Sequence, residues 1–473
     1  MTQAKPDLTT TSGKLTDLRN RLAEAQSPVG DEAIEATHAA GDLTARERLL
    51  ALLDEDSFVE TDALARHRAT EFAMDRTRPA TDGVVTGYGL VGGRRVCVFS
   101  QDDTVFDGAL GEVYAEKILK IYDLATKTGV PVVGIYAGVG PRLAEGVVTL
   151  GMYAKLFKAA ADASGLIPQI AVVSGSVQGL QSVGPWLADL VIGLDHDTAH
   201  LTATDDAEAI ARARTVLSYL PVNNRAEAPR RDAPERPATE SAALDTAIPD
   251  AEGKAFDVRA VLTQIVDDAT LLEVKAGVAG NVLTAFAHVD GRPVGVIANQ
   301  PTVQDAVLDA AAANKAARFI RTCDAFNLPI VQFVDSAGID PAEADSPTVQ
   351  QAAAQLAYAN AEASVGKITV VLRRALGSAY VLMGAKDTGA DLVYAWPTAQ
   401  IAVTGAQAAA AALDADVEKY AAEHLNPYRA TELGLVDAVI EPSTTRAKVA
   451  DGLLLLERKV VVTRPKKHGN IPL

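Results

Sequence analysis

The two halves of this 473-residue chain repeat the same short motifs at a fixed distance along the sequence. Each half has a Gly-Arg pair before an apolar run, a lysine within a helical pattern, and a proline before a second apolar run. The matching positions are Gly93 and Gly291, Lys117 and Lys315, and Pro131 and Pro329, each 198 residues apart, and Asp189 and Asp391, 202 residues apart. Three matches at the same offset and a fourth at a slightly larger offset indicate duplication of one αβ unit, because a solenoid would repeat roughly every 20–50 residues.

The composition limits the possible partners. Hydrophobic residues make up 48% of the chain, which is enough for substantial cores. The formal charge of −17 argues against a nucleic-acid partner, because phosphate backbones are bound by basic patches. We expect Cys97 and Cys323 to be buried thiols in a reducing compartment. No apolar run reaches the ~18 residues of a membrane span, so we expect a cytoplasmic globular protein with neither a membrane nor a nucleic-acid partner.

Short apolar runs alternate with longer helical patterns along both halves. In the first half we expect two helices within 14–60, a hairpin over 82–100, helices over 109–128 and 141–163, and strands over 131–136, 169–174 and 188–194. The second half repeats this order and ends in an amphipathic helix over 446–459. This alternation predicts an α/β fold with crossover connections and a mainly parallel or mixed sheet in each half.

A change of composition separates the two halves. Residues 225–250 are rich in Pro, Ala, Glu and Arg and contain few large apolar side chains, which is typical of a surface connector. We therefore expect an N-terminal domain over 1–224, a connector over 225–255 and a C-terminal domain over 256–473. A cleft between two like domains would be a common kind of ligand site.

The histidines give weak evidence for a metal site. His196 and His200 are four residues apart, which on a helix would place both on one face, and Asp195 and Asp197 could complete a ligand set. Short polar segments of this kind are more often solvated loops, and we expect no metal.

Other sequence signatures of catalysis are incomplete. The chain has no P-loop, and Gly138-Val139-Gly140 lacks the third glycine and downstream acid of a dinucleotide fingerprint. The segment Leu180–Gly184 is one glycine short of a nucleophile elbow, and no persuasive acid and histidine follow it. The side chains therefore offer no acid–base constellation.

Main-chain chemistry is the remaining possibility. A loop of small residues follows each central strand and the strand after it, in both halves. The four loops are Ala137–Gly140, Gly175–Gly179, Ser336–Gly338 and Ala375–Ala379. Small residues before a helix let peptide N–H groups converge on an oxygen that becomes negative. The alternative is that these glycines only permit tight turns and close packing.

Several longer motifs run nearly from end to end of the chain. They are Leu43–Arg48, Pro79–Gly83, Phe99–Asp102, Gly165–Ile170, Lys315–Phe319, Ala395–Val403 and Lys467–Leu473. With these motifs the chain resembles the carboxyltransferase (β) subunit of biotin-dependent acyl-CoA carboxylases, particularly the actinobacterial acetyl-/propionyl-CoA type, which supply fatty acid biosynthesis. The resemblance implies two tandem crotonase-like domains and ring-shaped hexamers. In such rings the N-domain of one subunit meets the C-domain of another, with acyl-CoA on the N-domain side.

The resemblance also implies a mechanism and its site residues. Carboxybiotin, presented by a partner carrier subunit of the biotin carboxylase component, releases CO2, and no cofactor is bound directly. The ureido nitrogen takes the α-proton of the acyl-CoA, and the enolate attacks CO2. One amide pair, Gly179 and Leu180, would hold the thioester oxygen, and another, Ser378 and Ala379, the biotin carbonyl. The substrate-binding positions implied by the family are Val139, Gly140, Arg142, Gly377, Tyr380 and Val381.

The chain departs from the family at these positions. The family's Gly-Gly becomes Gly179-Leu180, where the isobutyl group is expected to crowd the thioester. Its Ser-Gly-Gly-Ala-Arg becomes Gly138–Arg142, which places a proline, with no N–H, at 141. Its Gly-Gly-Ala-Tyr becomes Gly377–Tyr380, with both amides kept. A long family segment near the CoA site is missing, and residues 193–205 bridge the gap.

Three hypotheses follow. The chain could be a working carboxyltransferase that acts on an unusual acyl-CoA, in a homo- or hetero-hexameric ring. It could instead be a catalytically silent structural or regulatory β-like subunit in a mixed ring with an active paralogue. An unrelated crotonase-type hydrolase or isomerase is disfavoured, because no candidate side-chain base stands at the loops.

Overall fold

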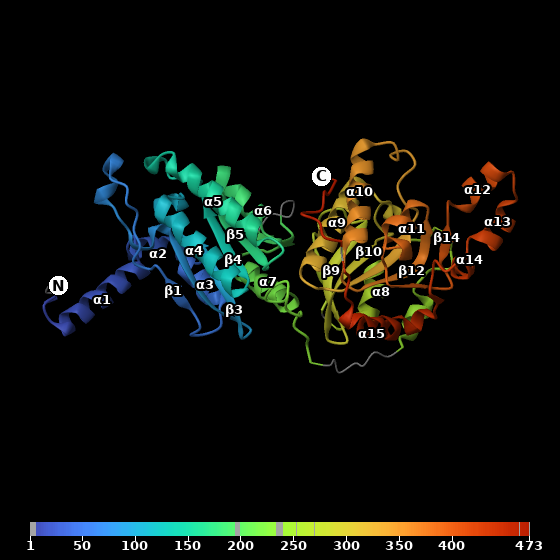
Figure 1. The fold of residues 1–473 in the computed structure, drawn as a ribbon, viewed down its shortest axis with the longest axis horizontal. Coiled ribbons are helices and arrows are strands. Elements are labelled where there is room, and N and C mark those ends of the chain that lie inside the picture. The colour runs from blue at the N-terminus through green and yellow to red at the C-terminus, as the bar shows by residue number, and fades with distance from the viewer. Residues whose placement is uncertain are drawn as a thin grey trace. The chain divides into compact units, whose positions relative to one another are not determined.

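The structure of the protein is a computed structural model that describes residues 6–193, 199–232, 240–251, 253–268, 270–462 and 464–472. The chain forms two compact units, unit 1 (Met1–Asn224) and unit 2 (Arg225–Leu473), coloured blue to green and yellow to red in Figure 1. Each unit is a sheet covered by helices on both faces.

The strands of unit 1 lie side by side in chain order. They are β1 (Val59–Thr61), β2 (Val84–Val91), β3 (Arg94–Gln101), β4 (Val132–Gly138), β5 (Gln169–Val177), β6 (Leu190–Gly193) and β7 (Leu201–Thr202). The first three pair antiparallel, and from β3 to β7 the pairing is parallel. The carboxyl ends of β3, β4 and β5 therefore meet at one edge, where a parallel sheet places its ligands.

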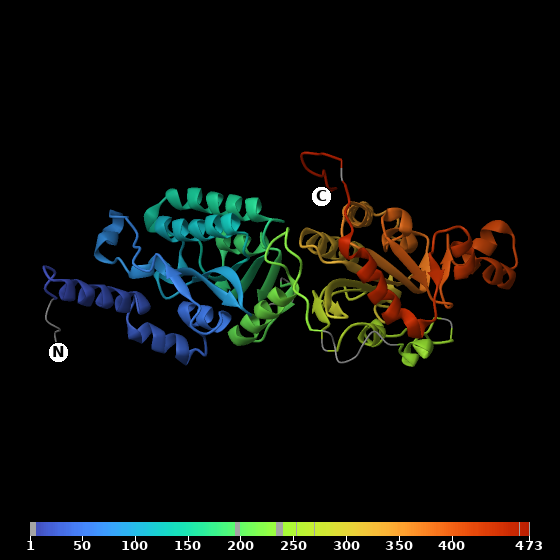
Figure 2. The ribbon, with the colours of Figure 1, turned by 60° about the horizontal axis from the view of Figure 1, so that its bottom comes forward.

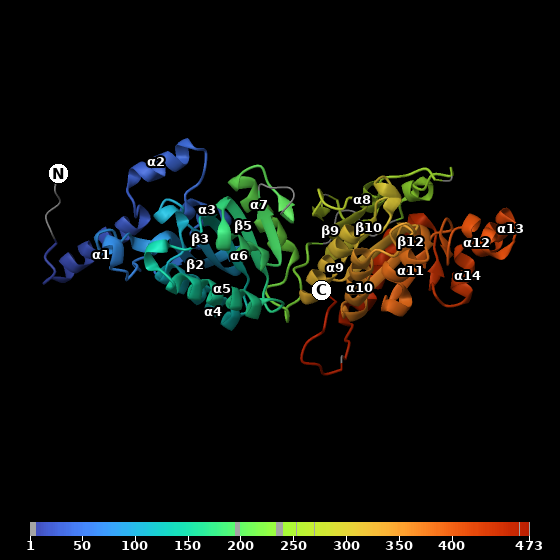
Figure 3. The same cartoon turned by 90° about the horizontal axis from the view of Figure 1, so that it is seen from above.

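The helices of unit 1 cover both faces of its sheet. They are α1 (Thr11–Gln26), α2 (Asp31–Ala39), α3 (Ala45–Leu52), α4 (Glu112–Thr128), α5 (Val148–Ala163), α6 (Val183–Trp186) and α7 (Asp206–Tyr219). Figure 2 shows α4 and α5 on one face and α3 and α7 on the other, and Figure 3 shows α1 and α2 at the periphery of the unit. Helix α4 buries Tyr114, Ile118, Ile121 and Ala125, whose three- and four-residue spacing puts them on one side.

Unit 2 repeats this architecture. Its strands lie in the order β15 (Ala438–Val439), β13 (Leu392–Ala395), β12 (Lys367–Leu376), β11 (Ile330–Ser336), β10 (Arg292–Asn299), β9 (Val282–Val289) and β8 (Leu272–Val274), and β14 (Gln400–Ala402) pairs with the end of β12. Its helices are α8 (Val258–Ile265), α9 (Ala310–Ala325), α10 (Pro347–Glu362), α11 (Ser378–Leu382), α12 (Ala406–Leu413), α13 (Val417–His424), α14 (Pro427–Glu432) and α15 (Thr445–Leu455).

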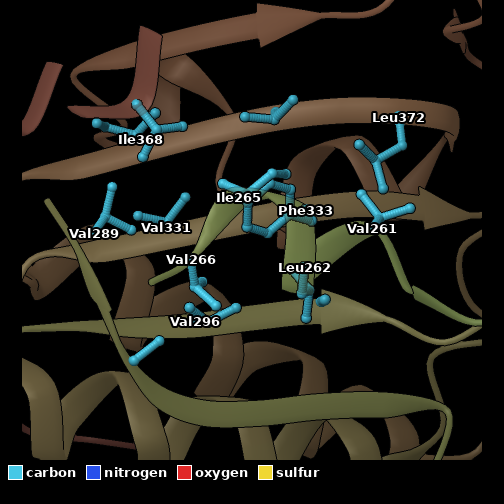
Figure 4. Packing of buried hydrophobic residues seen from close by; sticks show 14 of the residues in the cluster. Val261, Leu262, Ile265, Val266, Val289, Val296, Val331, Phe333, Ile368 and Leu372 are labelled. Carbon is cyan, nitrogen blue, oxygen red and sulfur yellow. The ribbon is translucent and has the colours of Figure 1, made fainter. Parts of the chain in front are cut away.

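The core of unit 2 lies between its sheet and the helices α8 and α15. Figure 4 shows Leu262 and Ile265 of α8 against Phe333 of β11, with Ile368 and Leu372 of β12 beside them. All five residues are at most 1% exposed. The β-branched and aromatic residues of these strands fill a continuous apolar layer, as expected for a sheet covered on both faces.

The two sheets share the spacing that the sequence motifs predict. Strands β2, β3, β4 and β5 begin 198 residues before β9, β10, β11 and β12, and β6 begins 202 residues before β13. The predicted α/β fold of two like domains is confirmed.

The two lysines of the repeat have equivalent roles. Lys117 Nζ donates a hydrogen bond to the carbonyl of Thr81 over 2.8 Å, and Lys315 Nζ to the carbonyl of Val278 over 2.9 Å. Burial lowers the pKa of each lysine to about 8. Each lysine fastens a long helix to the turn that precedes the second strand, so the repeated lysine is structural.

Some elements differ from the sequence-based expectations. Three helices rather than two occupy the N-terminal segment, separated near Gly30 and Gly41. The helix expected from residue 141 begins at Val148, because Pro141 forms a bridge with Leu110 and Gly146 adopts a φ of +66°. Glycine permits this conformation, and it interrupts the helix.

The segment expected to be a connector contacts unit 2 at several points. The backbone N–H of Arg231 donates to the carbonyl of Gly291, and that of Ser241 to Ser443, both over 2.9 Å. Leu244 is 1% exposed and belongs to the core of unit 2. Residues 240–251 are therefore part of the packing of unit 2.

Other expectations concern thiols, metals and membranes. Cys97 and Cys323 are both free and buried, and burial raises the pKa of Cys97 to about 11. Among the described residues no group of three or more His, Cys, Asp or Glu could hold a metal. His196 lies outside the described residues, whereas His200 Nδ1 accepts a hydrogen bond from Val191 N–H. No helix in the described part of the chain is long and apolar enough to span a membrane.

The C-terminal segment is fastened to α10 through Glu362. This carboxylate pairs with Lys466 and, at 2.7 Å, with Arg321, and it accepts a hydrogen bond from the Tyr358 hydroxyl at 3.0 Å. Burial raises the pKa of Glu362, but the bonds from Lys466, Arg321 and Tyr358 outweigh it and bring the pKa to about 2.

We expect Glu362→Gln to make trypsin cleave after Lys466 several-fold faster, because the amide keeps the shape but loses the charge that holds the segment. Mass spectrometry of timed digests measures the rate. Glu423→Gln, which changes an acid that is 56% exposed, is the matched control and should leave the rate unchanged. Equal rates in the two variants would contradict the prediction.

Candidate active site

In unit 1 the loop after β4 passes very close to neighbouring backbone. A Cβ on Gly138, whose φ is +123°, would lie 2.4 Å from the carbonyl oxygen of Gly108. The carbonyl of Gly140 accepts a hydrogen bond of 2.8 Å from Leu110 N–H, which fixes the loop on the start of α4. Val139, between the two glycines, is 48% exposed. The sequence therefore needs glycine at 138 for packing, and the loop still presents one residue to solvent.

The loop after β5 carries the first expected amide pair. Gly179 has a φ of +56° and begins a short 3-10 helix, η5 (Gly179–Ser182). The first N–H groups of a helix have no acceptor within it. Among the hydrogen bonds of the described residues none uses the N–H of Gly179 or of Leu180. No atom lies within 4 Å of the position that a Cβ on Gly179 would take, so the space beside this glycine is open.

The side chain of Leu180 contacts apolar residues of unit 1. It is partly buried and, like Val177, packs against the core cluster of unit 1, of which Tyr136 is a buried member. Part of the isobutyl group is therefore removed from water by packing within unit 1, and crowding of the thioester by this group stays a prediction.

Buried hydrogen bonds of the Gln181 side chain hold this loop in place. Its Nε2 donates to Gln101 Oε1 at 2.6 Å, and its Oε1 accepts from the hydroxyl of Tyr153 at 2.5 Å. Gln101 Oε1 also accepts from the N–H of Ala137 at 2.9 Å, so one buried network joins the loops after β4 and β5. Sequence reasoning missed Gln181 as a site residue, although it follows the amide pair directly.

Arg142, an expected substrate-binding residue, is buried instead. It is 3% exposed and forms ion pairs of 2.7 Å with Asp82 and with Glu145, and its guanidinium lies 4.4 Å from the centre of the Phe106 ring. Burial raises the pKa of Asp82, although the charge of Arg142 opposes that shift. We assign Arg142 to fixing the loop, since its side chain has no face left for a substrate.

The two carboxylates paired with Arg142 cap helix α4. Glu145 Oε2 accepts from the N–H of Glu112 at 2.7 Å, and Asp82 Oδ2 accepts from the N–H of Tyr114 at 2.9 Å. The residue before the helix is glycine and has no side chain to do this. The family motif Pro79–Gly83 thus supplies a helix cap, which satisfies otherwise unpaired amides.

Unit 2 places its amide pair one residue further along than unit 1. Gly377 has a φ of +49° and corresponds to Gly179, 198 residues earlier. Its N–H donates to the carbonyl of Ala402 in β14 at 2.9 Å and is therefore used. The next two amides, of Ser378 and Ala379, begin α11, and no hydrogen bond of the described residues uses them.

The strand β14 explains this shift. In the described part of unit 1, no strand pairs with the end of β5 in the way that β14 pairs with the end of β12. The N–H of Gly179 therefore stays available. Ala379 is fully buried against Gly338, whereas Ser378 is half-buried. The two units therefore offer amide pairs that differ in register and in exposure.

The remaining expected positions lie on α11. The Tyr380 hydroxyl donates to the carbonyl of Leu435 at 3.2 Å, and burial raises its pKa. Val381 is 48% exposed. Tyr380 is thus held by the protein, and Val381 is free to contact a ligand.

A buried acid supports the loop of unit 2. Asp335, at the end of β11, is fully buried and pairs with Arg373 at 2.7 Å and with Arg374 at 2.9 Å. Its own N–H donates to Asn299 Oδ1 at 3.2 Å, as Ala137 does to Gln101 in unit 1. The only signal in the sequence is the pair of arginines that ends the apolar run of β12.

Each of the two like α/β units has a left-handed glycine and two main-chain amides after its fifth sheet strand, and main-chain amides in such a turn are the kind of group that binds an oxyanion. The family called carboxyl transferase domain matches residues 36–198 and 196–471. The chain belongs to this family.

Comparison with individual proteins leads to the same family. The chain is 46% identical over 529 aligned positions to the biotin-dependent acetyl-/propionyl-coenzyme A carboxylase beta5 subunit of Mycobacterium tuberculosis, covering 99% of this chain and 96% of the relative. It is 43% identical to the propionyl-CoA carboxylase beta chain of Saccharopolyspora erythraea, covering 99% and 97%. A solved structure of transcarboxylase 12S, with hydrolysed methylmalonyl-coenzyme A bound, superposes with a TM-score of 0.95 at 39% identity, covering 98% and 99%.

The relatives carry residues that this chain lacks. The alignment with the Mycobacterium tuberculosis protein has 529 positions, more than the 473 residues of this chain. The family match divides at residues 196–198, within the stretch where the sequence predicts a missing segment. Residues 194–198 lie outside the described residues.

Proposed function

We propose that this chain is the working carboxyltransferase (β) subunit of a biotin-dependent acyl-CoA carboxylase. It transfers CO2 from carboxybiotin to the α-carbon of a short acyl-CoA, of the acetyl or propionyl class named in its relatives. The observation that carries the proposal is the open amide pair at Gly179 and Leu180, beside a left-handed glycine with free space next to it.

The residues present fit both substrates. The amides of Gly179 and Leu180 donate to the thioester oxygen, whose negative charge grows as the enolate forms. The amides of Ser378 and Ala379 donate to the ureido oxygen of biotin as its N–CO2 bond breaks and its nitrogen takes the α-proton. The new C–C bond joins the α-carbon to CO2, so every proton is accounted for without a side-chain base.

One accessible valine lies near the amide pair of each unit. Val139 borders the unit 1 loop and Val381 lies one turn after the unit 2 pair, and each is 48% exposed. We assign the exposed Val139 and the adjacent Gly140 to the acyl-CoA side, and Gly377, Tyr380 and Val381 to the biotin side. Apolar residues in such positions select ligands by size, as is common in pockets with few polar groups.

The partners follow from the same proposal. A biotin carboxylase and biotin carrier subunit supplies carboxybiotin, and this chain binds no cofactor of its own. The solved transcarboxylase 12S is described as a hexamer assembly, which supports a hexameric ring of this chain alone or with a paralogue. Two free buried thiols support a place in the reducing cytoplasm.

The reverse reaction isolates the activity of this chain. Purified chain, mixed with methylmalonyl-CoA and free biotin, should move the carboxyl group to biotin and release propionyl-CoA, because the same amide pairs serve both directions. Malonyl-CoA tests the acetyl class in parallel, and chromatography of the CoA products measures the rate. Biotin-dependent release of acyl-CoA supports the proposal.

The silent-subunit alternative makes the opposite prediction. According to this alternative, the chain alone is inactive with both substrates, and in a mixed assembly all of the activity comes from the paralogue. Substitution of this chain at the Gly179 loop should then leave the rate of the mixed assembly unchanged. That result would overturn the proposal.

A further inference from the structure

A side-chain oxygen bridges the two loops beside the amide pair of unit 2. Ser378 Oγ accepts a hydrogen bond of 2.9 Å from the N–H of Ile339, in the loop that follows β11. Glycine at position 378, the residue of the resembled family, could not make this bond. The bridge is therefore a property of this chain.

The loop held by Ser378 is itself rigidly placed. Ser336 Oγ donates to the carbonyl of Ala306 at 2.6 Å and accepts from the N–H of Gly338 at 3.0 Å. The carbonyl of Gly338 accepts from Leu308 N–H at 3.0 Å. The serine bridge thus connects the amide pair to a support made of three further hydrogen bonds.

The loop also packs directly on the amide pair. A Cβ on Gly338, whose φ is +94°, would lie 2.5 Å from Ser378 Oγ and 3.2 Å from the nitrogen of Ala379. No side chain fits there without displacing one of these groups. Any movement of the loop at 338 therefore changes the surroundings of the Ala379 amide.

Unit 1 holds its equivalent loop by a different side chain. Leu180, 198 residues before Ser378, has no hydroxyl, and Gln181 provides the anchor through Gln101 and Tyr153. Gln181 corresponds to Ala379, which has no polar side chain. In each unit a side chain next to or within the amide pair thus links two neighbouring loops, and in unit 2 Ser378 links the loops after β11 and β12.

We propose that the Ser378 hydroxyl is a positioning residue for the biotin side of the reaction. It holds the loop 336–339 against α11, so that the amides of Ser378 and Ala379 keep their direction toward the ureido oxygen. The inference rests on the proposed function, because only a carboxyltransferase uses this pair. An oxyanion donor loses much of its effect when it must reorganise during the reaction.

Kinetics of the reverse reaction test this role. We expect Ser378→Ala to lower kcat/KM for free biotin about five- to tenfold, the loss of one hydrogen bond, while KM for methylmalonyl-CoA stays unchanged. Ser378→Thr keeps the oxygen and should recover most of the rate. A matched control is Ser443→Ala, a serine of unit 2 that lies outside the loops after β11 and β12.

Hydrogen exchange provides a second measurement that needs no activity. Peptides covering 336–345 should exchange faster in Ser378→Ala than in the wild type, with the same melting temperature. Faster exchange with an unchanged kcat/KM for free biotin would overturn the positioning role. So would a rise in KM for methylmalonyl-CoA as large as the fall in kcat/KM for biotin, or an increase in kcat/KM for biotin. If the wild-type chain does not catalyse the reverse reaction, the proposed function fails. If peptides covering 336–345 exchange at the same rate in Ser378→Ala and the wild type, the hydrogen-bonded bridge is excluded whatever the activity.

Discussion

We expect the Leu180→Pro variant to lose about 10²–10³-fold in kcat, because proline removes one of two oxyanion donors without adding a charge. The amide of Leu180 has no other partner in the described structure, so its loss should appear in catalysis rather than in folding. The measurement is kcat for biotin-dependent decarboxylation of methylmalonyl-CoA, with KM determined in the same assay.

Proline is suited to this position. Leu180 is the second residue of η5, and the first turn of a helix tolerates a missing N–H and a φ near −65°. Gly179 before it has no Cβ, which removes one of the two contacts that make a following proline unfavourable. The backbone path can therefore persist while the donor is removed.

Leu180→Ala is the matched control. It keeps the N–H but removes the isobutyl group that packs on the unit 1 core. We expect its kcat to stay within a few-fold of wild type, with a modest loss of stability from partial burial. Equal kcat values for the proline and alanine variants would show that the amide is not a donor in the reaction.

The second large effect is on stability. We expect Arg142→Met to lower the free energy of unfolding of unit 1 by about 3–5 kcal/mol, because it leaves Asp82 and Glu145 buried without their shared cation. The methionine side chain has a similar length and can still pack against Phe106, so lost packing makes only a small contribution to the change in the free energy of unfolding. Urea unfolding followed by circular dichroism gives the magnitude, and hydrogen exchange at α4 locates it in unit 1.

An exposed pair shows what a lost charge costs without burial. Lys158 and Asp162 are 74% and 62% exposed and pair across one turn of α5. We expect Lys158→Met to change the free energy of unfolding by less than about 0.5 kcal/mol. A similar loss in both variants would mean that Arg142 contributes little beyond a surface charge, and would return it to the candidates for substrate binding.

The candidate site could be located from the sequence but not completed. Glycines after apolar runs identified the loops near Gly179 and Gly377, since a left-handed turn favours glycine in any context. Gln181 and Asp335 escaped notice, because a single polar residue near a strand end has no local pattern. Their roles depend on partners 80 and 38 residues away, Gln101 and Arg373.

The sequence by itself determined the duplicated α/β units and the small-residue loops that follow two strands in each of them. Hydrophobic period, helix signals and glycine φ preferences depend on neighbouring residues, and the offset of 198 preserved them in both halves. Only the tertiary structure decided that Arg142 is buried, that Leu180 packs against the unit 1 core cluster, and that β14 takes the amide of Gly377. Side-chain direction and the pairing of each N–H are set by packing between segments distant in sequence, which local patterns do not encode.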